Sequence, residues 1–174
     1  RADMGEVKMD SLPVSLDTLI EDLHRQASLL GHERDIQVVL KTTAPAVVLG
    51  DELRLRELFL NLLDNAVKYS YPSGIVDVAL TIEQTQARVT VTDRGIGIVQ
   101  EEQSRIFDRF YRTDNARTHT KKGTGLGLAI CAWIVESHRG QLKVQSKVGE
   151  GSTFTVILPL APTPASAKRA LKSS

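Results

Sequence analysis

The sequence predicts an α+β fold, a two-layer sandwich in which helices pack on one sheet. A strongly periodic helix is expected from Asp51 to about Tyr69, and helical spacing recurs at 124–137. The runs 75–83 and 87–92 alternate apolar and polar residues, which indicates strands with one buried face. Because consecutive strands are often joined by short turns, this arrangement fits better than a doubly wound parallel sheet.

The first fifty residues predict a linker, an edge strand, a helix and two further strands. Residues 1–10 are polar and resemble the last turn of an upstream helix followed by a linker. A short edge strand is expected at 13–16, and Asp17 is expected to cap a helix that Gly31 ends. Two β-branched runs then have the pattern of neighbouring strands, at 36–41 and 46–49.

The second half of the chain predicts a long functional loop and a closing pair of strands. Residues 93–122 have no sustained strand pattern and are rich in basic side chains, so we expect a lid with one short helix near 101–110. A helix, two strands and a disordered tail complete the chain, at 124–137, 141–146, 153–158 and 161–174. One folded domain is therefore expected over 11–160.

The composition narrows the class of protein. With 174 residues, 41% of them hydrophobic and 25% charged, the chain suits one soluble globular domain. Its 22 Lys and Arg residues balance 21 Asp and Glu residues, so no nucleic-acid partner is expected. The single Cys131 fits packing in a helix and a reducing, cytoplasmic location. No membrane contact is expected, because the sequence has neither a signal peptide nor a run of about 18 apolar residues. Since the chain begins at Arg1, it reads as a fragment whose parent could carry a membrane anchor.

The helix at 51–69 carries polar side chains beside its apolar stripe. Glu57, Asn61, Asn65 and Lys68 recur at three- and four-residue steps, which places them on one flank at about 3.6 residues per turn. An amide oxygen is a hard ligand suited to Mg²⁺, and a lysine ammonium is suited to phosphate. The alternative is a solvated helix face. Three glycine-rich turns later in the chain favour the functional interpretation.

Those turns have the chemistry of a nucleotide site. DRGIG at 93–97 follows a strand directly, so Asp93 could accept a hydrogen bond from the adenine 6-amino group while the glycines let the backbone approach the base. GTGLGL at 123–128 opens a helix, where unpaired N–H groups and the helix dipole favour phosphate. GEGST at 149–153 could be only a hairpin turn, and a tight turn capped by Asp is the alternative for the first. Neither a P-loop nor a Rossmann fingerprint is present.

The order of five motifs is the specific signal. NLLDNAVKYS at 61–70 is similar to an N box, and DRGIG is similar to a first glycine box. IFDRFYR at 106–112 is similar to an F box, and GTGLGLAI and GEGST are similar to the second and third glycine boxes. Together they resemble the ATP-binding catalytic domain of sensor histidine kinases, in the GHKL superfamily shared with gyrase, the MutL proteins and the large heat-shock chaperones. The resemblance implies a Bergerat ATP-binding fold, with a mixed, mostly antiparallel sheet of about five main strands on three helices and a mobile ATP lid. It also implies that ATP and Mg²⁺ are bound.

The resemblance carries roles over to the matching positions. Asn65 would ligate Mg²⁺ through its side-chain oxygen. Asn61, Lys68 and Arg112 are the catalytic candidates, the first two beside the phosphates and the last at the γ-phosphate. Asp93 would read adenine. Tyr69 would pack against the adenine or its ribose, and Thr153 would support the hydrogen-bond network through water. The other implied nucleotide contacts are Gly95, Gly97, Ile98, Phe110, Gly123, Gly125, Leu126, Gly127 and Leu128.

Other residues are weighed against plainer roles. Phe107, with Phe110, resembles the aromatics that anchor the lid. Glu57 occupies the place of the water-activating base in gyrase-type relatives, but a histidine kinase needs no such water, so a surface or structural role is favoured. Trp133 is expected in the core. Solvent-facing lid charges are expected at Arg105, Arg109, His119, Lys121 and Lys122.

The histidines of the chain lack the context of a phosphoacceptor, which in the family is His followed by an acid and then Pro on a helical hairpin. His32 has the acid only and is expected on a surface turn, while His24 and His138 lie on predicted helices. The acceptor is therefore expected on a separate dimerisation domain of the parent, upstream of this fragment.

We therefore expect a histidine kinase that transfers the γ-phosphate of Mg-ATP to the phosphoacceptor domain of the same protein. In two-component signalling, a response-regulator receiver domain would be the downstream partner. The parent is expected to be a homodimer and the fragment a monomer. The alternatives are a GHKL-type ATPase, a non-catalytic nucleotide-binding scaffold, and a serine-directed kinase resembling those that act on anti-sigma factors.

Overall fold

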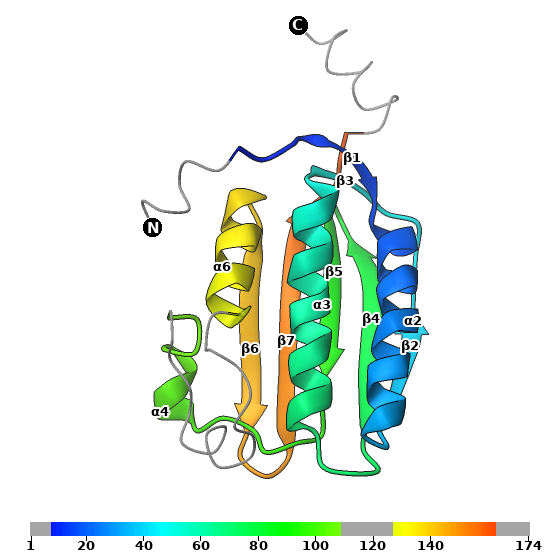
Figure 1. Cartoon of the computed structure of the whole chain (residues 1–174). Coiled ribbons are helices and arrows are strands. Elements are labelled where there is room, and N and C mark those ends of the chain that lie inside the picture. Colours follow the sequence, from blue (N-terminus) through cyan, green and yellow to red (C-terminus); the bar gives the residue numbers. More distant parts are fainter. Residues whose placement is uncertain (1–7, 109–126, 163–174) are drawn as a thin grey trace, which may run out of the picture.

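The computed structural model describes residues 8–108 and 127–162 and confirms the two-layer α+β architecture (Figure 1). The main sheet has the strand order β2-β4-β5-β7-β6. Only β2 and β4 pair in parallel, so the sheet is mixed and mostly antiparallel, as expected. In chain order its strands are β2 (Gln37–Thr42), β4 (Ile75–Glu83), β5 (Gln86–Thr92), β6 (Gln141–Lys147) and β7 (Gly151–Pro159).

Helices cover one face of this sheet. They are α2 (Leu16–Glu33), α3 (Glu52–Tyr69) and α6 (Gly127–Ser137), and α3 lies between the other two (Figure 1). A further short helix, α4 (Gln100–Gln103), lies beside the end of β6. None of the helices in the described ranges combines the length and the apolar character that a bilayer crossing requires.

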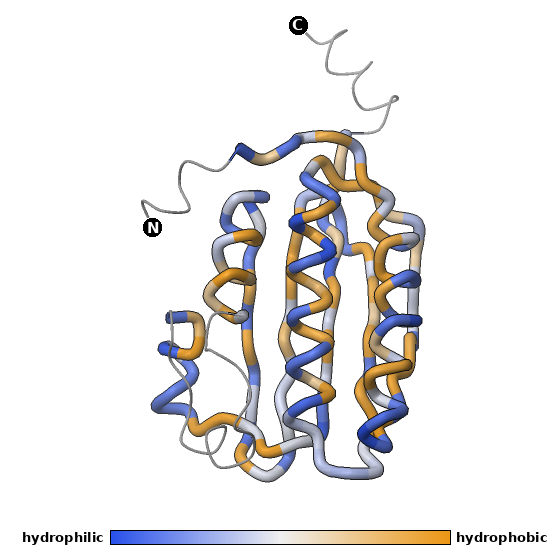
Figure 2. Tube along the Cα trace, viewed as in Figure 1, coloured by the Kyte–Doolittle hydropathy of each residue, from blue (hydrophilic) through white to orange (hydrophobic). Residues whose placement is uncertain are grey.

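The core lies between α3 and the sheet. The predicted apolar stripe of α3 is fully buried at Leu55, Leu58 and Phe59, and Figure 2 shows apolar residues recurring along all three long helices. Each such side chain contributes about 1.5–3 kcal/mol when it leaves water. The helix begins where expected, because the Asp51 carboxylate accepts a hydrogen bond from the Arg54 N–H at 3.1 Å. Helix propensity, capping and burial thus agree on the same segment.

The two runs predicted as neighbouring strands belong to different sheets, so that prediction was wrong. β2 pairs with β4, which buries Val38 beside Val76 under the helices. The second run is β3 (Val47–Gly50), and it pairs antiparallel with the predicted edge strand, β1 (Leu12–Ser15). The Leu16 N–H donates to the Ala46 carbonyl at 2.8 Å, which fixes this ribbon where α2 begins.

The predicted ends of α2 were also wrong. Ser15 is the N-cap residue, and Asp17 lies in the first turn, where its carboxylate accepts a hydrogen bond from the Ala46 N–H at 3.1 Å. Gly31 does not end the helix. A Cβ there would lie 2.4 Å from the Ile36 carbonyl oxygen, so the glycine permits the chain to fold back tightly into β2.

The later elements follow the sequence prediction more closely. The hairpins β4–β5 and β6–β7 are both present. The short helix predicted near 101–110 is limited to α4, and turns follow it up to residue 108. The start of the predicted helix at Thr124, residues 109–122 of the predicted lid and most of the two predicted terminal segments lie outside the described residues, so the domain boundaries remain a prediction.

Candidate nucleotide-binding site

The polar flank of α3 faces the start of α6. Asn61, Asn65 and Lys68 are half-buried, as expected for side chains beside a buried stripe. The Asn61 side-chain carbon lies 4.0 Å from the position a Cβ would take on Gly127, the first described residue of the second glycine box. Two motifs that are far apart in sequence therefore meet where α3 packs against α6.

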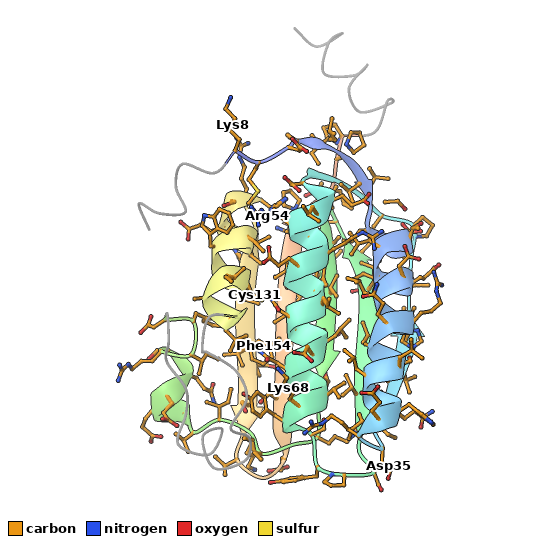
Figure 3. The ribbon with its side chains drawn as sticks, in the orientation of Figure 1. Lys8, Asp35, Arg54, Lys68, Cys131 and Phe154 are labelled. Atoms are coloured by element: carbon orange, nitrogen blue, oxygen red, sulfur yellow. The ribbon has the colours of Figure 1, made fainter. Side chains whose placement is uncertain are left out.

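Lys68 lies in the last turn of α3 (Figure 3). Its ammonium forms an ion pair with Asp64, one helical turn earlier, at 2.9 Å. The pair is partly exposed, so it contributes little to stability, on the order of 0–1 kcal/mol. A phosphate arriving at this flank would compete with the Asp64 carboxylate for the lysine.

Asp93 is the buried acid of the site. It follows β5 with only 6% of its surface exposed, and its Oδ1 accepts a hydrogen bond from the Ser152 N–H at 3.2 Å. Burial raises the pKa of Asp93 to about 7, although the backbone hydrogen bonds from Ser152 and Gly95 act in the opposite direction. A carboxyl group of this kind can accept a hydrogen bond from a purine amino group in a site that excludes water.

The first glycine box is bound to the end of α3. The Ile96 N–H donates to the Tyr69 carbonyl at 3.1 Å, and Ser70 forms a β-bridge with Gly95. A Cβ on Gly95 would lie 1.9 Å from the Tyr69 carbonyl oxygen, so a glycine is required for this backbone contact. The structure thus gives Gly95 a packing role; its expected role in making room for adenine, with Gly97 and Ile98, remains a prediction.

The third glycine box lies beside Asp93. Gly151 has φ +117°, and a Cβ there would lie 2.1 Å from the Asp93 carbonyl oxygen. The Thr153 hydroxyl lies 3.0 Å from the Thr92 hydroxyl, and the support of an adenine-binding network expected from Thr153 remains a prediction. Within this box, Ser152 contacts the Asp93 carboxylate through its N–H. GEGST is therefore a hairpin turn that also holds the buried acid.

The described part of the F box, residues 106–108, packs on the sheet. Ile106 is buried, and the Phe107 ring meets the Phe154 ring of β7 edge to face with 6.3 Å between centroids. Leu128 of α6 packs against the same core. Several predicted site residues lie outside the described part of the chain: Arg112, Phe110, Gly123, Gly125 and Leu126, together with the lid charges Arg109, His119, Lys121 and Lys122.

The weaker candidates have structural partners. Glu57 pairs with Arg54 at 3.1 Å, and the Arg54 guanidinium lies 5.5 Å from the centroid of the Trp133 ring. Trp133 is buried, as expected. Burial, with a smaller effect of the Glu57 charge, raises the pKa of the Cys131 thiol to about 12, which suits a packing role. Arg105 lies 3.9 Å from Asp108 on the surface.

The histidines also have structural contacts. His138 is buried at the end of α6, where its Nε2 accepts a hydrogen bond from the Asp51 N–H at 3.0 Å. Its Nδ1 then carries the proton that is donated to the Ile134 carbonyl at 2.8 Å. The His24 ring bonds to the Val38 carbonyl at 2.9 Å. His32 lies on the last turn of α2, not on the surface turn expected for it.

Sequence reasoning missed three polar residues near Asp93. Ser146 and Ser152 face each other across the β6–β7 hairpin with 2.7 Å between their hydroxyl oxygens. Gln103 of α4 donates to the carbonyls of Ile98 and Ser146 at 2.9 and 3.1 Å. A hairpin centred on the third glycine box pairs residue 146 with residue 152, so this spacing could have revealed the serine pair; nothing in the sequence marks Gln103.

The residues present suit a magnesium ion that arrives with phosphate. Within 8–108 and 127–162 there is no group of three or more His, Cys, Asp or Glu side chains that could hold a metal by itself. Mg²⁺ commonly keeps several waters and binds substrate phosphates with only one or two protein ligands. The half-buried amide of Asn65 fits such a role.

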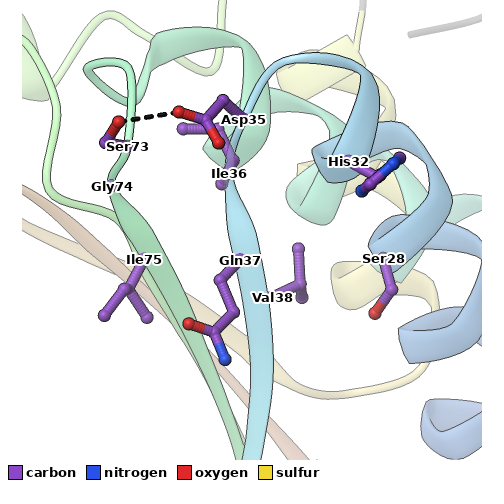
Figure 4. Close-up of a pocket in the computed structure, with 9 residues that line it drawn as sticks. All are labelled: Ser28, His32, Asp35, Ile36, Gln37, Val38, Ser73, Gly74 and Ile75. Atoms are coloured by element: carbon purple, nitrogen blue, oxygen red, sulfur yellow. Dashed lines mark hydrogen bonds between the residues drawn. The ribbon is translucent and has the colours of Figure 1, made fainter.

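A separate hollow of about 440 Å³ lies between the end of α2 and the starts of β2 and β4. Its rim includes a hydrogen bond from the Ser73 hydroxyl to the Asp35 carboxylate at 2.7 Å (Figure 4). None of the predicted nucleotide contacts lines it. The hollow is therefore distinct from the candidate nucleotide site.

Comparison with known proteins decides the family. Residues 50–162 match the family described as "Histidine kinase-, DNA gyrase B-, and HSP90-like ATPase". The chain belongs to this ATPase family. Similar members include the sensor-like histidine kinase SenX3 of Mycobacterium tuberculosis H37Rv, 40% identical over 84% of this chain and 36% of that protein. The phosphate regulon sensor protein PhoR of Pseudomonas aeruginosa is 40% identical over 84% of this chain and 33% of that protein.

Solved structures agree with this assignment. The mycobacterial sensor histidine kinase MprB matches with a TM-score of 0.75 and 33% identity, over 88% of this chain and 99% of that one. Full-length ShkA, solved in complex with AMPPNP, matches with a TM-score of 0.78 and 30% identity, over 89% of this chain and 32% of that one. This ATPase-family chain thus has the fold and class of a histidine kinase catalytic domain, and it spans about a third of the length of the curated relatives above.

Proposed function

We propose that this domain binds Mg-ATP between α3 and the lid and presents the γ-phosphate to a histidine on a separate domain of its parent. The observation that supports this most is that the polar flank of α3 and the turn after Asp93 are joined at one end of α3. The Ile96–Tyr69 backbone hydrogen bond joins the helix that carries Asn61, Asn65 and Lys68 to the turn after Asp93. The proposed adenine-binding residue, Asp93, and the proposed phosphate-binding flank of α3 are therefore connected by a backbone hydrogen bond.

The proposed roles follow from the chemistry of each side chain. The ion, when bound, supplies charge neutralisation for the phosphates, and Asn65 would hold it through its amide oxygen. Lys68 and Asn61 would orient the phosphates, and Arg112 would contact the γ-phosphate. Asp93 would accept a hydrogen bond from the adenine amino group. Positioning and electrostatic stabilisation are the main contributions a protein makes to phosphoryl transfer.

The acceptor and the downstream partner would lie on other domains. His24 and His138 are occupied by structural hydrogen bonds in the described part of the chain, which supports a nucleophile from elsewhere. We propose a phosphoacceptor histidine on the dimerisation domain of the same protein, with a response-regulator receiver domain as the later recipient. The relatives SenX3, a sensor-like histidine kinase, and PhoR, a phosphate regulon sensor protein, support this class of partner.

A GHKL-type ATPase is the second candidate. It would require Glu57 to activate water, but the ion pair with Arg54 and the neighbouring buried thiol of Cys131 assign Glu57 a structural environment. A scaffold that binds nucleotide without transferring phosphate is the third candidate. The fate of the γ-phosphate distinguishes the ATPase and the scaffold from the kinase.

The decisive experiment uses labelled ATP with the chain alone and with the upstream part of its parent. The kinase predicts calorimetric binding of Mg-ATP, negligible release of phosphate by the chain alone, and an acid-labile phosphohistidine when the upstream hairpin is added. Steady hydrolysis that Glu57→Ala abolishes would establish the ATPase instead. Binding without either product would leave the scaffold, and absence of binding at millimolar nucleotide would refute all three.

A further inference from the structure

The hydroxyl of Ser146 is the centre of a hydrogen-bond network beside the candidate site. It accepts from the Ile98 N–H at 2.8 Å, donates to the Gly151 carbonyl at 3.0 Å, and lies 2.7 Å from the Ser152 hydroxyl. A serine hydroxyl has one proton and two lone pairs. Since the proton is committed to Gly151, the Ser152 hydroxyl must be the donor to Ser146. All three hydrogen-bonding positions of Ser146 are thereby filled.

This network occupies a polar row on the helix-covered face of the sheet. Two residues away along each strand, towards the core, an apolar row crosses β5, β7 and β6 at Val91, Phe154 and Val144. Beyond them the matching row is Asp93, Ser152 and Ser146. Ser152 joins the row on both sides, because its N–H donates to the Asp93 carboxylate while its hydroxyl donates to Ser146. The apolar core therefore gives way to linked polar groups at the buried acid.

The same serine holds the segment that leads from the first glycine box towards the lid. The Ile98 N–H is bound by the Ser146 hydroxyl, and the Ile98 carbonyl accepts from the Gln103 amide at 2.9 Å. Gln103 also donates to the Ser146 carbonyl at 3.1 Å, and the Gly149 N–H donates to the Ile96 carbonyl at 2.9 Å. The backbone at 96–98 is thus fixed to the β6–β7 hairpin at three points.

We propose that Ser146 is a positioning residue for adenine recognition. It acts through Ser152 and Gly151 on the Asp93 carboxylate and through Ile98 on the start of the lid. The inference rests on the proposed nucleotide-binding function and adds a residue that touches neither nucleotide nor metal. Its consequence is that discrimination between adenine and guanine depends on a hydroxyl two strands away from Asp93.

The expected selectivity follows from the groups at position 6 of the purine. Adenine presents an amino donor there, which an ionised Asp93 can accept, whereas guanine presents a carbonyl acceptor that the same carboxylate repels. Removing the Ser146 hydroxyl leaves the Ile98 N–H, the Gly151 carbonyl and the Ser152 hydroxyl without this partner. The Asp93 carboxylate then loses its fixed position, so adenine binding should weaken more than guanine binding.

The test compares the dissociation constants of ADP and GDP, with Mg²⁺, for the 174-residue chain and its variants by calorimetry. Ser146→Ala is expected to weaken ADP binding by about tenfold and GDP binding by less than about twofold, as expected when buried polar groups lose a partner. Ser152→Ala removes one bond of the network and should weaken ADP binding by about threefold. Ser146→Thr keeps the hydroxyl on a strand and should restore the wild-type preference.

Ser28→Ala is the matched control. It removes a serine hydroxyl that donates to one helix carbonyl of α2, and it should leave both dissociation constants unchanged. If the Ser146 hydroxyl only stabilises the hairpin, Ser146→Ala will lower the melting temperature without changing the ratio of the ADP and GDP dissociation constants. That result would overturn the proposal. If Ser146→Ala does not fold, Ser152→Ala decides in the same way. A wild-type chain that binds neither nucleotide would instead refute the proposed function itself.

Discussion

At the scale of single residues, Asp93 shows a conflict between stability and binding. Its carboxyl is buried with few partners, and burial raises its pKa to about 7. The folded protein therefore holds the Asp93 proton more tightly than the unfolded chain, in which the carboxyl has its ordinary pKa of 3.8. By linkage, the stabilising contribution of Asp93 is fully present below the unfolded pKa and is lost as the pH rises through about 7.

Asp93→Asn should reverse the two properties. Its melting temperature relative to the wild type should rise between pH 5 and pH 8, because the variant has no buried group to ionise. ADP affinity of the wild type should rise by up to about tenfold from pH 6 to pH 8, as the ionised acceptor becomes the major form. The variant should bind ADP more weakly at pH 8 and lack that part of the pH dependence. Titration of the nucleotide phosphates affects both proteins equally, so it cancels in the ratio of their ADP dissociation constants. If the ADP affinities of the wild type and the variant changed in parallel with pH, this account would be contradicted.

Asn65 tests the assignment of the metal ligand. Asn65→Ala should reduce the ability of Mg²⁺ to strengthen ATP binding, by about tenfold in the ratio of dissociation constants with and without the ion, while metal-free binding changes little. Calorimetry in magnesium and in EDTA gives this ratio. Asn61→Ala, on the same flank one turn earlier, is the matched comparison and should weaken binding in both conditions. Equal losses with and without Mg²⁺ for Asn65→Ala would exclude it as the ligand.

At the scale of elements, the site is assembled where α3, the first glycine box and the β6–β7 hairpin meet. Each contact is made largely by backbone: Tyr69 with Ile96, Ile96 with Gly149, and Asp93 with Ser152. Backbone contacts at such short range exclude side chains, which explains why glycines recur at this junction. Their spacing along the sequence therefore reflects packing as well as ligand chemistry.

Gly95→Ala should be strongly destabilising for this reason. Its new Cβ would meet the Tyr69 carbonyl oxygen at 1.9 Å, so the turn must separate from α3, at a cost of about 1–3 kcal/mol or more. Gly149→Ala is the control, because its Cβ meets nothing within 4 Å and only the positive φ of +81° opposes it, at about 1 kcal/mol. Urea unfolding measures both. A Gly95→Ala cost no larger than that of Gly149→Ala would contradict the packing role.

Phe107 packs edge to face against Phe154 of β7. Phe107→Ala removes the edge-to-face contact with Phe154 and should cost about 1–2 kcal/mol of unfolding free energy, because Phe107 is only partly buried. Phe59→Ala, in the centre of α3, should cost about 3–5 kcal/mol. ATP affinity should nevertheless fall more in Phe107→Ala than in Phe59→Ala. Calorimetry at a temperature where both variants are folded checks this, and the opposite order would show that Phe107 does not anchor a nucleotide-binding lid.

At the scale of the whole molecule, the helices are also tied together at the end of α3 opposite the site. The buried His138, directly after α6, accepts a hydrogen bond from the Asp51 N–H, and a Cβ on Gly50 would lie 2.5 Å from its ring. The Asp51 carboxylate also accepts from the Asp10 N–H at 3.1 Å. The chain segment that enters the domain is therefore bonded directly to the cap of the helix that carries the candidate site.

Nucleotide should stabilise this whole unit. A ligand that binds only the folded state adds RT ln(1 + [L]/Kd), about 2.7 kcal/mol at one hundred times Kd. Thermal unfolding should shift upward with Mg-ATP and with Mg-ADP, and the ATP should remain intact after the scan. A shift that decays as ATP is consumed would favour the ATPase over the kinase.

Local patterns determined much of the architecture. The stripe and the polar flank of α3 are both encoded within 18 residues, since a helix turns its periodicity directly into faces. The two hairpins follow from alternation and short turns, and the five motifs in order identified the ATPase family. The helix and hairpin inferences depend on neighbours in the sequence and the family inference on the order of the motifs, so no knowledge of the packing was needed.

The tertiary structure decided what depends on distant partners. β2 could have paired with β3, but it pairs in parallel with β4, and β3 pairs with β1 instead. The Asp17 carboxylate likewise accepts a hydrogen bond from the N–H of Ala46, 29 positions away in the sequence. Nothing local marks Gln103, because its bond to the Ser146 carbonyl joins residues 43 positions apart, and the bond from the Ile98 N–H to the Ser146 hydroxyl spans 48 positions. Periodicity specifies which face of an element is buried, but only packing specifies which partner buries it.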